Sequence, residues 1–267
     1  MTPTRAAALV LHQAIVLGAG VAFLSGVRAF SGRTLRGGHD PFGAVDAIVY
    51  SVLLAALVAL TIRLYRNLTD SDSGSLGLKL TRRRVIAFGT GAVVAMAFRS
   101  WPWLLSIATG SAVIIDRVAA PRGLILGVFI AVSTAVFEEI ASRAFPIRLF
   151  SGWPALRLTM LSATLFVLQH ILDERLSVIA VLYLASIGTI FGAAYVMTGN
   201  IWLGAGLHAG FYYASVIPSG VTNLGAWYRV AGTMIIPSWL FDSLLIAMGL
   251  IALDIVRRRS AMTNEVT

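Results

Sequence analysis

The chain has 267 residues, of which 58% are apolar and only 12% charged, with a mean hydropathy of +0.84. Such a composition, with several apolar runs of about 20 residues, indicates a polytopic membrane protein. The net charge of +9 follows the loops and is not gathered on a soluble domain, which excludes nucleic-acid binding. The absence of cysteine excludes disulfides, thiol nucleophiles and thiolate metal sites.

The apolar runs predict an all-α, polytopic transmembrane bundle of about eight spans. We expect these spans at residues 6–26, 41–62, 85–115, 123–150, 154–172, 176–198, 201–217 and 234–256. Arg99 and the Trp101-Pro102-Trp103 sequence interrupt the third run, so we expect there a short span followed by a helix lying in the outer interface. The loop 67–77, rich in Asp, Ser and Gly, is expected to be a solvated connector.

We divide the chain into three parts on this basis. Residues 1–122 hold the N-terminal spans and a cytosolic loop, residues 123–217 hold a catalytic core of spans four to seven, and residues 218–267 hold the last span and a basic cytosolic tail. With a cytosolic N-terminus, 13 of the 21 basic residues fall on inner segments, so the positive-inside rule predicts that both termini are cytosolic. Arginine outnumbers lysine 20 to 1, which indicates a bacterial genome and localisation in the cell membrane.

Two adjacent glutamates, Glu138 and Glu139, lie in the fourth apolar run, with Arg143 just beyond them. A carboxylate in a span costs roughly 2.5 to 3.5 kcal/mol on insertion scales, and such groups usually face a bundle interior or a wet cavity. Residues four apart share a helix face, so we expect Glu139 to meet Arg143 while Glu138 is free to address a water. In the alternative interpretation, all three charges only anchor the helix at the cytosolic interface.

Two of the four histidines, His170 and His208, lie inside apolar runs. Ionisable residues within spans usually mark functional sites. We predict that both histidines converge with Glu138 in the cytosolic half of the bundle. His12, early in the first span, is interpreted as a helix-packing or interfacial histidine, and His39 as a solvated loop residue.

Whether these side chains meet depends on the length of the fourth helix. If the helix ended at Arg143, Glu138 and His170 would lie about 24 Å apart in depth, at a rise of about 1.5 Å per residue. If it continues through Phe150, with Pro146 as a kink, Glu138 moves to mid-depth and the groups can converge. We predict the longer helix.

Three motifs in spans four, five and seven resemble those of the CAAX protease and bacteriocin-processing family, called CPBP or Abi, whose members are intramembrane proteases related to the type II CAAX prenyl endopeptidases. The family motif EExxxR reads here Glu138-Glu139-Ile-Ala-Ser-Arg143, FxxxH reads Phe166-Val-Leu-Gln-His170, and HxxxN reads His208-Ala-Gly-Phe-Tyr212. The resemblance covers residues 123–217. It is made more specific by the order of the motifs and by the glycine-rich sequence that leads into the last histidine.

The resemblance implies a glutamate-type endopeptidase that needs no cofactor and cuts a membrane-associated peptide or protein. Glu138 would be the general base that activates water, His170 would hold and polarise that water, and His208 would stabilise the oxyanion. The supporting residues are Glu139, Arg143 and Tyr212. Tyr212 replaces the family's asparagine, so the second oxyanion donor is the phenol, a backbone amide, or absent. Ala144 stands where a glycine often follows the arginine.

Other functions stay open on the sequence. Glu138, His170 and His208 with a water would form a familiar catalytic zinc set, so the chain could be a Zn²⁺-dependent intramembrane metalloprotease with these residues as ligands. The altered third motif also suits a noncatalytic peptide-binding or bacteriocin-immunity-type protein, and a proton-coupled transporter is a further alternative. No His-Glu-x-x-His, Gly-x-Gly-Asp or Gly-x-Ser-Gly sequence occurs, which excludes other known intramembrane protease motifs.

Overall fold

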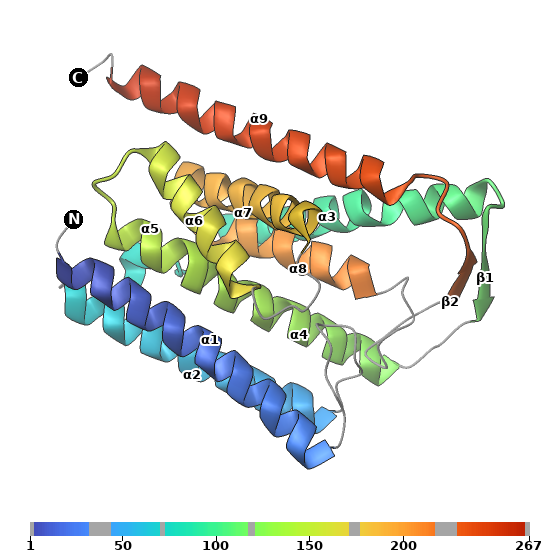
Figure 1. Ribbon diagram of the computed structural model, residues 1–267, viewed down its shortest axis with the longest axis horizontal. Helices are drawn as coiled ribbons and strands as arrows, with labels where there is room; N and C mark the ends of the chain where they lie inside the picture. Colours follow the sequence, from blue (N-terminus) through green and yellow to red (C-terminus); the bar gives the residue numbers. More distant parts are fainter. Residues whose placement is uncertain are drawn as a thin grey trace.

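The computed structural model describes residues 3–31, 44–69, 73–116, 121–170, 177–216 and 229–264, and it is a helical bundle with one small sheet (Figure 1). The all-α bundle is thus confirmed. The elements are α1 Pro3–Ser31, α2 Ala44–Thr69, η1 Ser73–Leu76, α3 Arg82–Ala108, β1 Ala112–Asp116, α4 Pro121–Glu139, η2 Ile140–Ala144, α5 Phe145–Leu149, α6 Ala155–Gln169, α7 Val178–Thr198, α8 Trp202–Val216, β2 Arg229–Gly232 and α9 Ser238–Asn264.

Among the described residues, five helices are long and apolar enough to cross a membrane. They are Pro3–Phe23, Ile48–Thr69, Arg82–Ala108, Val178–Thr198 and Ser238–Ser260. A helix covers most of each of the eight expected spans, and the number that cross the bilayer stays a prediction, as does the division into three parts. Large apolar side chains such as Val10, Ile125 and Val178 are more than two-thirds exposed, as expected of helices that face lipid.

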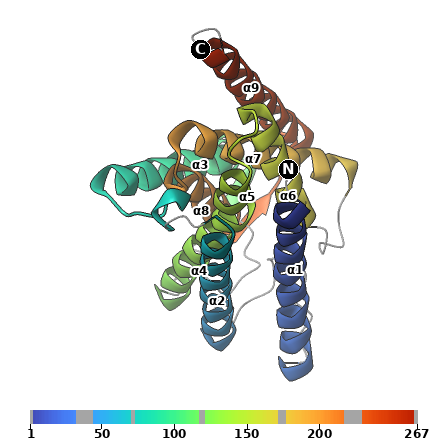
Figure 2. The same ribbon diagram turned by 90° about the vertical axis from the view of Figure 1, so that its left-hand side faces the viewer.

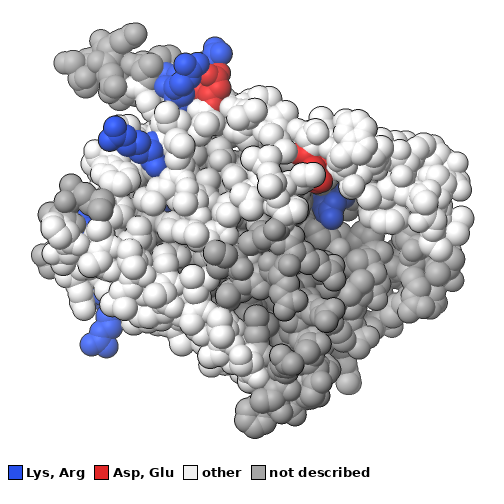
Figure 3. All heavy atoms as spheres, viewed as in Figure 1, with Lys and Arg blue, Asp and Glu red and all other residues white. Residues whose placement is uncertain are grey.

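The helices are stacked in layers. Figures 1 and 2 show α1 and α2 on one side, α9 on the other, and α4 to α8 between them. Among the described residues, the face drawn in Figure 3 is largely uncharged, and most of its basic side chains lie toward the end of the bundle where both termini lie.

Long-range hydrogen bonds tie the segments at this end together. Arg5 donates from Nη1 to the carbonyl of Leu149 at 3.2 Å, and the Tyr195 hydroxyl donates to the carbonyl of Leu76 at 3.1 Å. These segments are among those that the positive-inside rule assigns to one side of the membrane. The Leu76 side chain is fully buried at this end of the bundle. The described part of the loop 67–77, which was expected to be solvated, therefore packs against the bundle.

The third span differs from its expected form. One helix, α3, continues through Pro102 to Ala108, so the prediction of a short span followed by an interfacial helix is wrong. Membrane helices tolerate proline within a span, and the missing N–H of Pro102 here costs only the regular bond to the carbonyl of Phe98. The chain then turns at Gly110, whose φ is +76°, and β1 pairs antiparallel with the distant strand β2, a two-stranded sheet that the apolar pattern did not predict.

The fourth helix has the longer form. α4, η2 and α5 follow one another without a break from residue 121 to 149, which confirms that prediction. The segment η2 is a π-helix in which Phe145 N–H bonds to the carbonyl of Ile140. It directly precedes the turn that contains Pro146, whose missing N–H disturbs the regular α-helical ladder.

Local signals set the position of α8. The Ser177 side chain caps α7 by accepting from the Ala180 N–H at 3.2 Å, and α7 ends at Gly199 in the left-handed conformation, with φ of +67°. The chain therefore reverses within a few residues. In α8, a Cβ at Gly206 or Gly210 would collide with the backbone of α3, so these glycines allow the two helices to pack closely.

Candidate active site

Glu139 and Arg143 form a completely buried ion pair. Glu139 ends α4 and Arg143 lies in η2, and the Glu139 Oε1 to Arg143 Nη1 distance is 3.0 Å, with no exposed surface on either side chain. The four-residue spacing predicted this contact. Because both charges are fully buried, the pair does not act as an anchor at the cytosolic interface.

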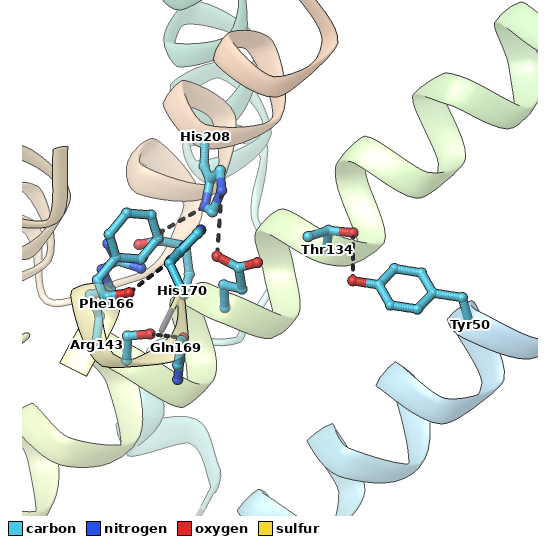
Figure 4. Close-up of polar contacts among 10 residues, drawn as sticks. Tyr50, Thr134, Arg143, Phe166, Gln169, His170 and His208 are labelled. Carbon is cyan, nitrogen blue, oxygen red and sulfur yellow. Dashed lines mark hydrogen bonds and ion pairs between the residues drawn. The ribbon is translucent and has the colours of Figure 1, made fainter. Parts of the chain in front are cut away.

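His208 lies between the two carboxylates. Its Nε2 is 3.6 Å from Glu138 Oε2, and its Nδ1 is 3.5 Å from Glu139 Oε1 (Figure 4). The Glu138 side chain keeps 17% of its surface exposed, whereas Glu139 keeps none. Of the two glutamates, Glu138 is therefore the one that a solvent molecule or a peptide can reach.

His170 caps the C-terminal end of α6. Its Nδ1 is 2.8 Å from the carbonyl oxygen of Phe166, and because a carbonyl only accepts, this nitrogen carries the proton. In a neutral ring, Nε2 is then left as an acceptor. The rings of His170 and His208 both pack against Phe166, at centroid distances of 4.6 and 5.7 Å, and in Figure 4 the His170 ring extends toward His208.

Two phenylalanines enclose the Arg143 guanidinium. Its carbon lies 4.4 Å from the centre of the Phe166 ring and 5.3 Å from that of Phe191, within the range of cation–π attraction. Phe191 also packs on His208 at 5.3 Å. Phe166 is a buried residue of the apolar core. Sequence reasoning did not single out Phe191, which carries no motif.

Gly204 makes room for the Glu139 carboxylate. A Cβ built at this glycine would lie 2.5 Å from Glu139 Oε2, closer than real Cβ contacts allow. Gly204 belongs to the glycine-rich sequence before His208. The family resemblance includes this sequence but gives Gly204 no role. The missing side chain lets α8 carry His208 up against the two glutamates.

Two tyrosines lie within electrostatic range of Glu138. Tyr212, one turn after His208 in α8, is one, and Tyr50 of α2 is the other. In Figure 4 Tyr50 reaches from α2 toward α4, where the Thr134 hydroxyl donates to its oxygen at 3.5 Å. The sequence offers no signal for Tyr50, because nothing in it pairs α2 with α4.

Unsatisfied polar atoms concentrate in this place. Nine buried side-chain nitrogen and oxygen atoms of the described residues have no hydrogen-bond partner in the protein, and seven of them belong to Glu138, Glu139, Arg143 and His208. The Glu139–Arg143 contact is among these because it has the distance of an ion pair without the angles of a hydrogen bond. Native proteins leave few buried polar groups unpaired, and such clusters are typical of catalytic sites.

The described side chains do not fit a resident metal ion. No group of three or more His, Asp or Glu in the described ranges is arranged to hold one. Glu139 faces Arg143, and His208 presents both ring nitrogens to carboxylates. The peptide-bond hydrolysis proposed for this site therefore uses no metal.

Comparison with known proteins gives one match. Residues 120–214 match the family described as type II CAAX prenyl endopeptidase Rce1-like. Comparisons with curated proteins and with solved structures give no match. The matched segment runs from α4 to α8, less than half of the chain, and it holds every site residue above except Tyr50. The match indicates an endopeptidase of the CAAX protease type, and the apolar helices indicate a multi-pass membrane protein. This segment is therefore similar to the Rce1-like endopeptidases of the CAAX protease and bacteriocin-processing family, the resemblance that the three motifs predicted.

Proposed function

We propose that this protein is an intramembrane endopeptidase in which Glu138 activates a water molecule for attack on a peptide bond. One observation carries the proposal: His208 contacts two carboxylates, of which Glu138 is partly exposed and Glu139 is fully buried on Arg143. The two glutamates thus have different environments, which is the usual way in which neighbouring carboxylates take different roles.

Glu138 is the proposed general base. It takes a proton from the water as the water oxygen attacks the carbonyl carbon, and it then gives a proton to the amine that leaves when the C–N bond breaks. His170 helps to hold the water, because its Nε2 is an acceptor while Nδ1 donates to the Phe166 carbonyl. Atoms and protons balance in this scheme without a cofactor.

His208 is the proposed oxyanion donor. An N–H from its ring would stabilise the negative charge that develops on the carbonyl oxygen, and such preorganised donors contribute most where water is excluded. Glu139 positions the ring through its 3.5 Å contact with Nδ1. Arg143 in turn offsets the charge of Glu139, so that this carboxylate serves structure rather than proton transfer.

The substrate is proposed to be a membrane-embedded or membrane-bound peptide that enters from the cytosolic side. If the chain is bacterial, as its arginine content indicates, the substrate carries no prenyl group. Apolar side chains exposed along the helices suit a protein that meets its substrate within the bilayer.

The proposal is tested by peptide-library cleavage with the purified, detergent-solubilised protein. We expect wild type to cleave, Glu138→Gln to lose activity, and a zinc chelator to have no effect. Asp254→Asn is the matched control, since it makes the same chemical change at an exposed ion pair of α9 and should leave cleavage unchanged. Loss of activity with chelator and recovery with zinc would replace the proposal by the metalloprotease alternative.

Tyr212 favours a second candidate, a noncatalytic peptide-binding or immunity-type protein, because the asparagine of the third motif is missing. The candidates are distinguished by Tyr212→Asn and Tyr212→Phe. In a peptidase, Tyr212→Asn restores the family's donor and raises kcat, whereas Tyr212→Phe removes the phenol and lowers it if the phenol donates to the oxyanion. A binding protein would cleave in neither form and would bind peptide equally well after Glu138→Gln.

A further inference from the structure

A connected set of buried and partly buried hydrogen bonds joins the N-terminal helix to the π-helix of the site. It connects α1, α2, α6 and η2, and none of its α1 or α2 residues lies in the segment that matches the family. Its members are Thr61, His12, Gln13, Gln169, Ser142 and the main-chain carbonyl of Ala141.

The set begins at a carbonyl that the helix itself leaves without a regular partner. In an α-helix Ala141 C=O would accept from Phe145 N–H, but that donor bonds to Ile140 in the π-helix. In π register the donor would be residue 146, which is Pro146 and has no N–H. The side-chain Nε2 of Gln13 supplies the bond instead, at 3.2 Å.

The bonds then form a ring. Gln13 Oε1 accepts from Gln169 Nε2 at 3.0 Å, and Gln169 Oε1 accepts from the Ser142 hydroxyl at 2.7 Å. Ser142 follows Ala141 in η2, so the ring begins and ends on the π-helix. It holds three segments that are far apart in the sequence.

The second helix fixes the orientation of the Gln13 amide. Thr61 donates its hydroxyl proton to the carbonyl of Leu57 at 2.7 Å, so at 2.8 Å it accepts from His12 Nε2. His12 Nδ1 is then an acceptor and faces Gln13 Nε2 at 3.3 Å. The amide nitrogen of Gln13 thus has two acceptors, and its oxygen has one donor. A flipped amide would place oxygen against the Ala141 carbonyl.

We propose that Gln13 is a positioning residue for the proposed peptidase. The ring includes Ser142, which precedes Arg143, and Gln169, which precedes His170. It therefore fixes the position of the π-helix that carries Arg143 and of the end of α6 that carries His170. Through Gln13, α1 thus helps to position the residues of the active site. The inference rests on the proposed function, because it assigns a catalytic consequence to the ring.

The first test measures kcat and KM of Gln13→Met, which keeps the side-chain length and removes the hydrogen bonds. We expect kcat to fall at least about tenfold, since small misplacements of catalytic groups are costly, and KM to change less than about twofold. Thr159→Val is the matched control: it removes a buried hydroxyl that donates to Ala155 within α6, away from the ring, and should leave kcat unchanged.

Ser142→Ala breaks a different bond of the same ring. If the ring acts as one unit, the double variant Gln13→Met/Ser142→Ala loses about as much kcat as either single variant, whereas independent structural losses would multiply. Equal kcat in wild type and Gln13→Met, or a multiplied loss in the double variant, would overturn the inference.

A readout independent of activity separates failure of this inference from failure of the proposed function. Hydrogen exchange of the backbone amides in residues 140–149 should be faster in Gln13→Met than in wild type, and unchanged in Thr159→Val. If wild type cleaves nothing but exchange responds in this way, the ring positions the π-helix and the peptidase proposal fails. If exchange in residues 140–149 is the same in both variants, the positioning role itself is wrong.

Discussion

The charges of Glu139 and Arg143 have no contact with solvent. Each offsets the other, and two aromatic rings further stabilise Arg143. Arg143 packs against the rings of Phe166 and Phe191, Glu139 lies against Gly204, and neither charged group makes a hydrogen bond of good geometry. A pair of this kind contributes little net stability, but removal of one partner leaves a buried uncompensated charge. The pair is therefore expected to fix geometry rather than to stabilise the fold.

Arg143→Leu is accordingly expected to destabilise the protein by about 3 to 5 kcal/mol, because it leaves Glu139 buried alone. The double variant Arg143→Leu/Glu139→Leu should recover part of this loss. Denaturant unfolding in mixed micelles measures both, with Arg257→Leu at the exposed pair with Asp254 as a control that should not change stability. Equal losses in the single and double variants would show that lost packing, not the unpaired charge, is the cause.

Gly204→Ala tests the close approach of α8 to the glutamates. The added Cβ would meet Glu139 Oε2 at 2.5 Å, so the carboxylate must move away from His208, and we expect at least about a tenfold loss of kcat. Gly18→Ala, where no atom lies within 4 Å, is the control. It should keep activity and, as a helix-interior replacement, stabilise the protein by about 0.5 to 1 kcal/mol. Full activity in Gly204→Ala would contradict the tight fit of Glu139 against α8.

At the scale of elements, the π-helix η2 decides how the fourth span presents its polar residues. It joins α4, which ends at Glu139, to α5, and it places Arg143 beside Glu139 while Ser142 faces Gln169. Pro146 and the π register together expose the Ala141 carbonyl to Gln13. A helix that stayed α-helical would direct these side chains differently, because one extra residue in a turn rotates everything beyond it.

Restoring a backbone donor should reduce the dependence on Gln13. Pro146→Ala supplies an N–H next to the Ala141 carbonyl, so we expect Gln13→Met to cost about 1 kcal/mol less stability in the Pro146→Ala background than in wild type, the value of one hydrogen bond. Comparison of the four unfolding free energies gives this coupling. Additive effects of the two substitutions would mean that Gln13 does not compensate for the proline.

At the scale of the whole molecule, layers built from distant helices surround the site. α2 brings Tyr50, α1 brings Gln13, and α8 brings His208 to the end of α4. Both described termini lie at one end of the bundle in Figure 1, as an even number of crossings would place them. The side of the membrane to which this end belongs stays a prediction from the distribution of arginine.

The absence of cysteine makes that orientation directly testable. Ser151→Cys, in the turn after α5, is expected on the cytosolic side, and Thr109→Cys, at the far end of α3, on the outer side. A membrane-impermeant thiol reagent applied to intact cells should label only Thr109→Cys, and permeabilised cells should show both. Labelling of Ser151→Cys in intact cells would reverse the predicted topology.

The helical bundle, the longer fourth helix and the contact of Glu139 with Arg143 could all be predicted from the amino-acid sequence. Apolar runs of span length leave few alternatives to helices, the four-residue spacing dictates that Glu139 meets Arg143, and small residues mark close helix contacts. These are local properties, and each follows from composition or helical period. The three motifs predicted a family resemblance, which the match over residues 120–214 confirms.

Which distant groups meet could not be predicted from the sequence and follows from how the helices pack. Tyr50, Gln13 and Phe191 carry no motif, and their contacts with α4, η2 and α8 arise from how whole helices cross. The sheet of β1 and β2 could not be predicted for the same reason, since its two strands lie far apart along the chain and short apolar segments suit helix and strand alike. The sequence specifies which reactive side chains are present, whereas packing between helices determines the neighbours that orient these side chains.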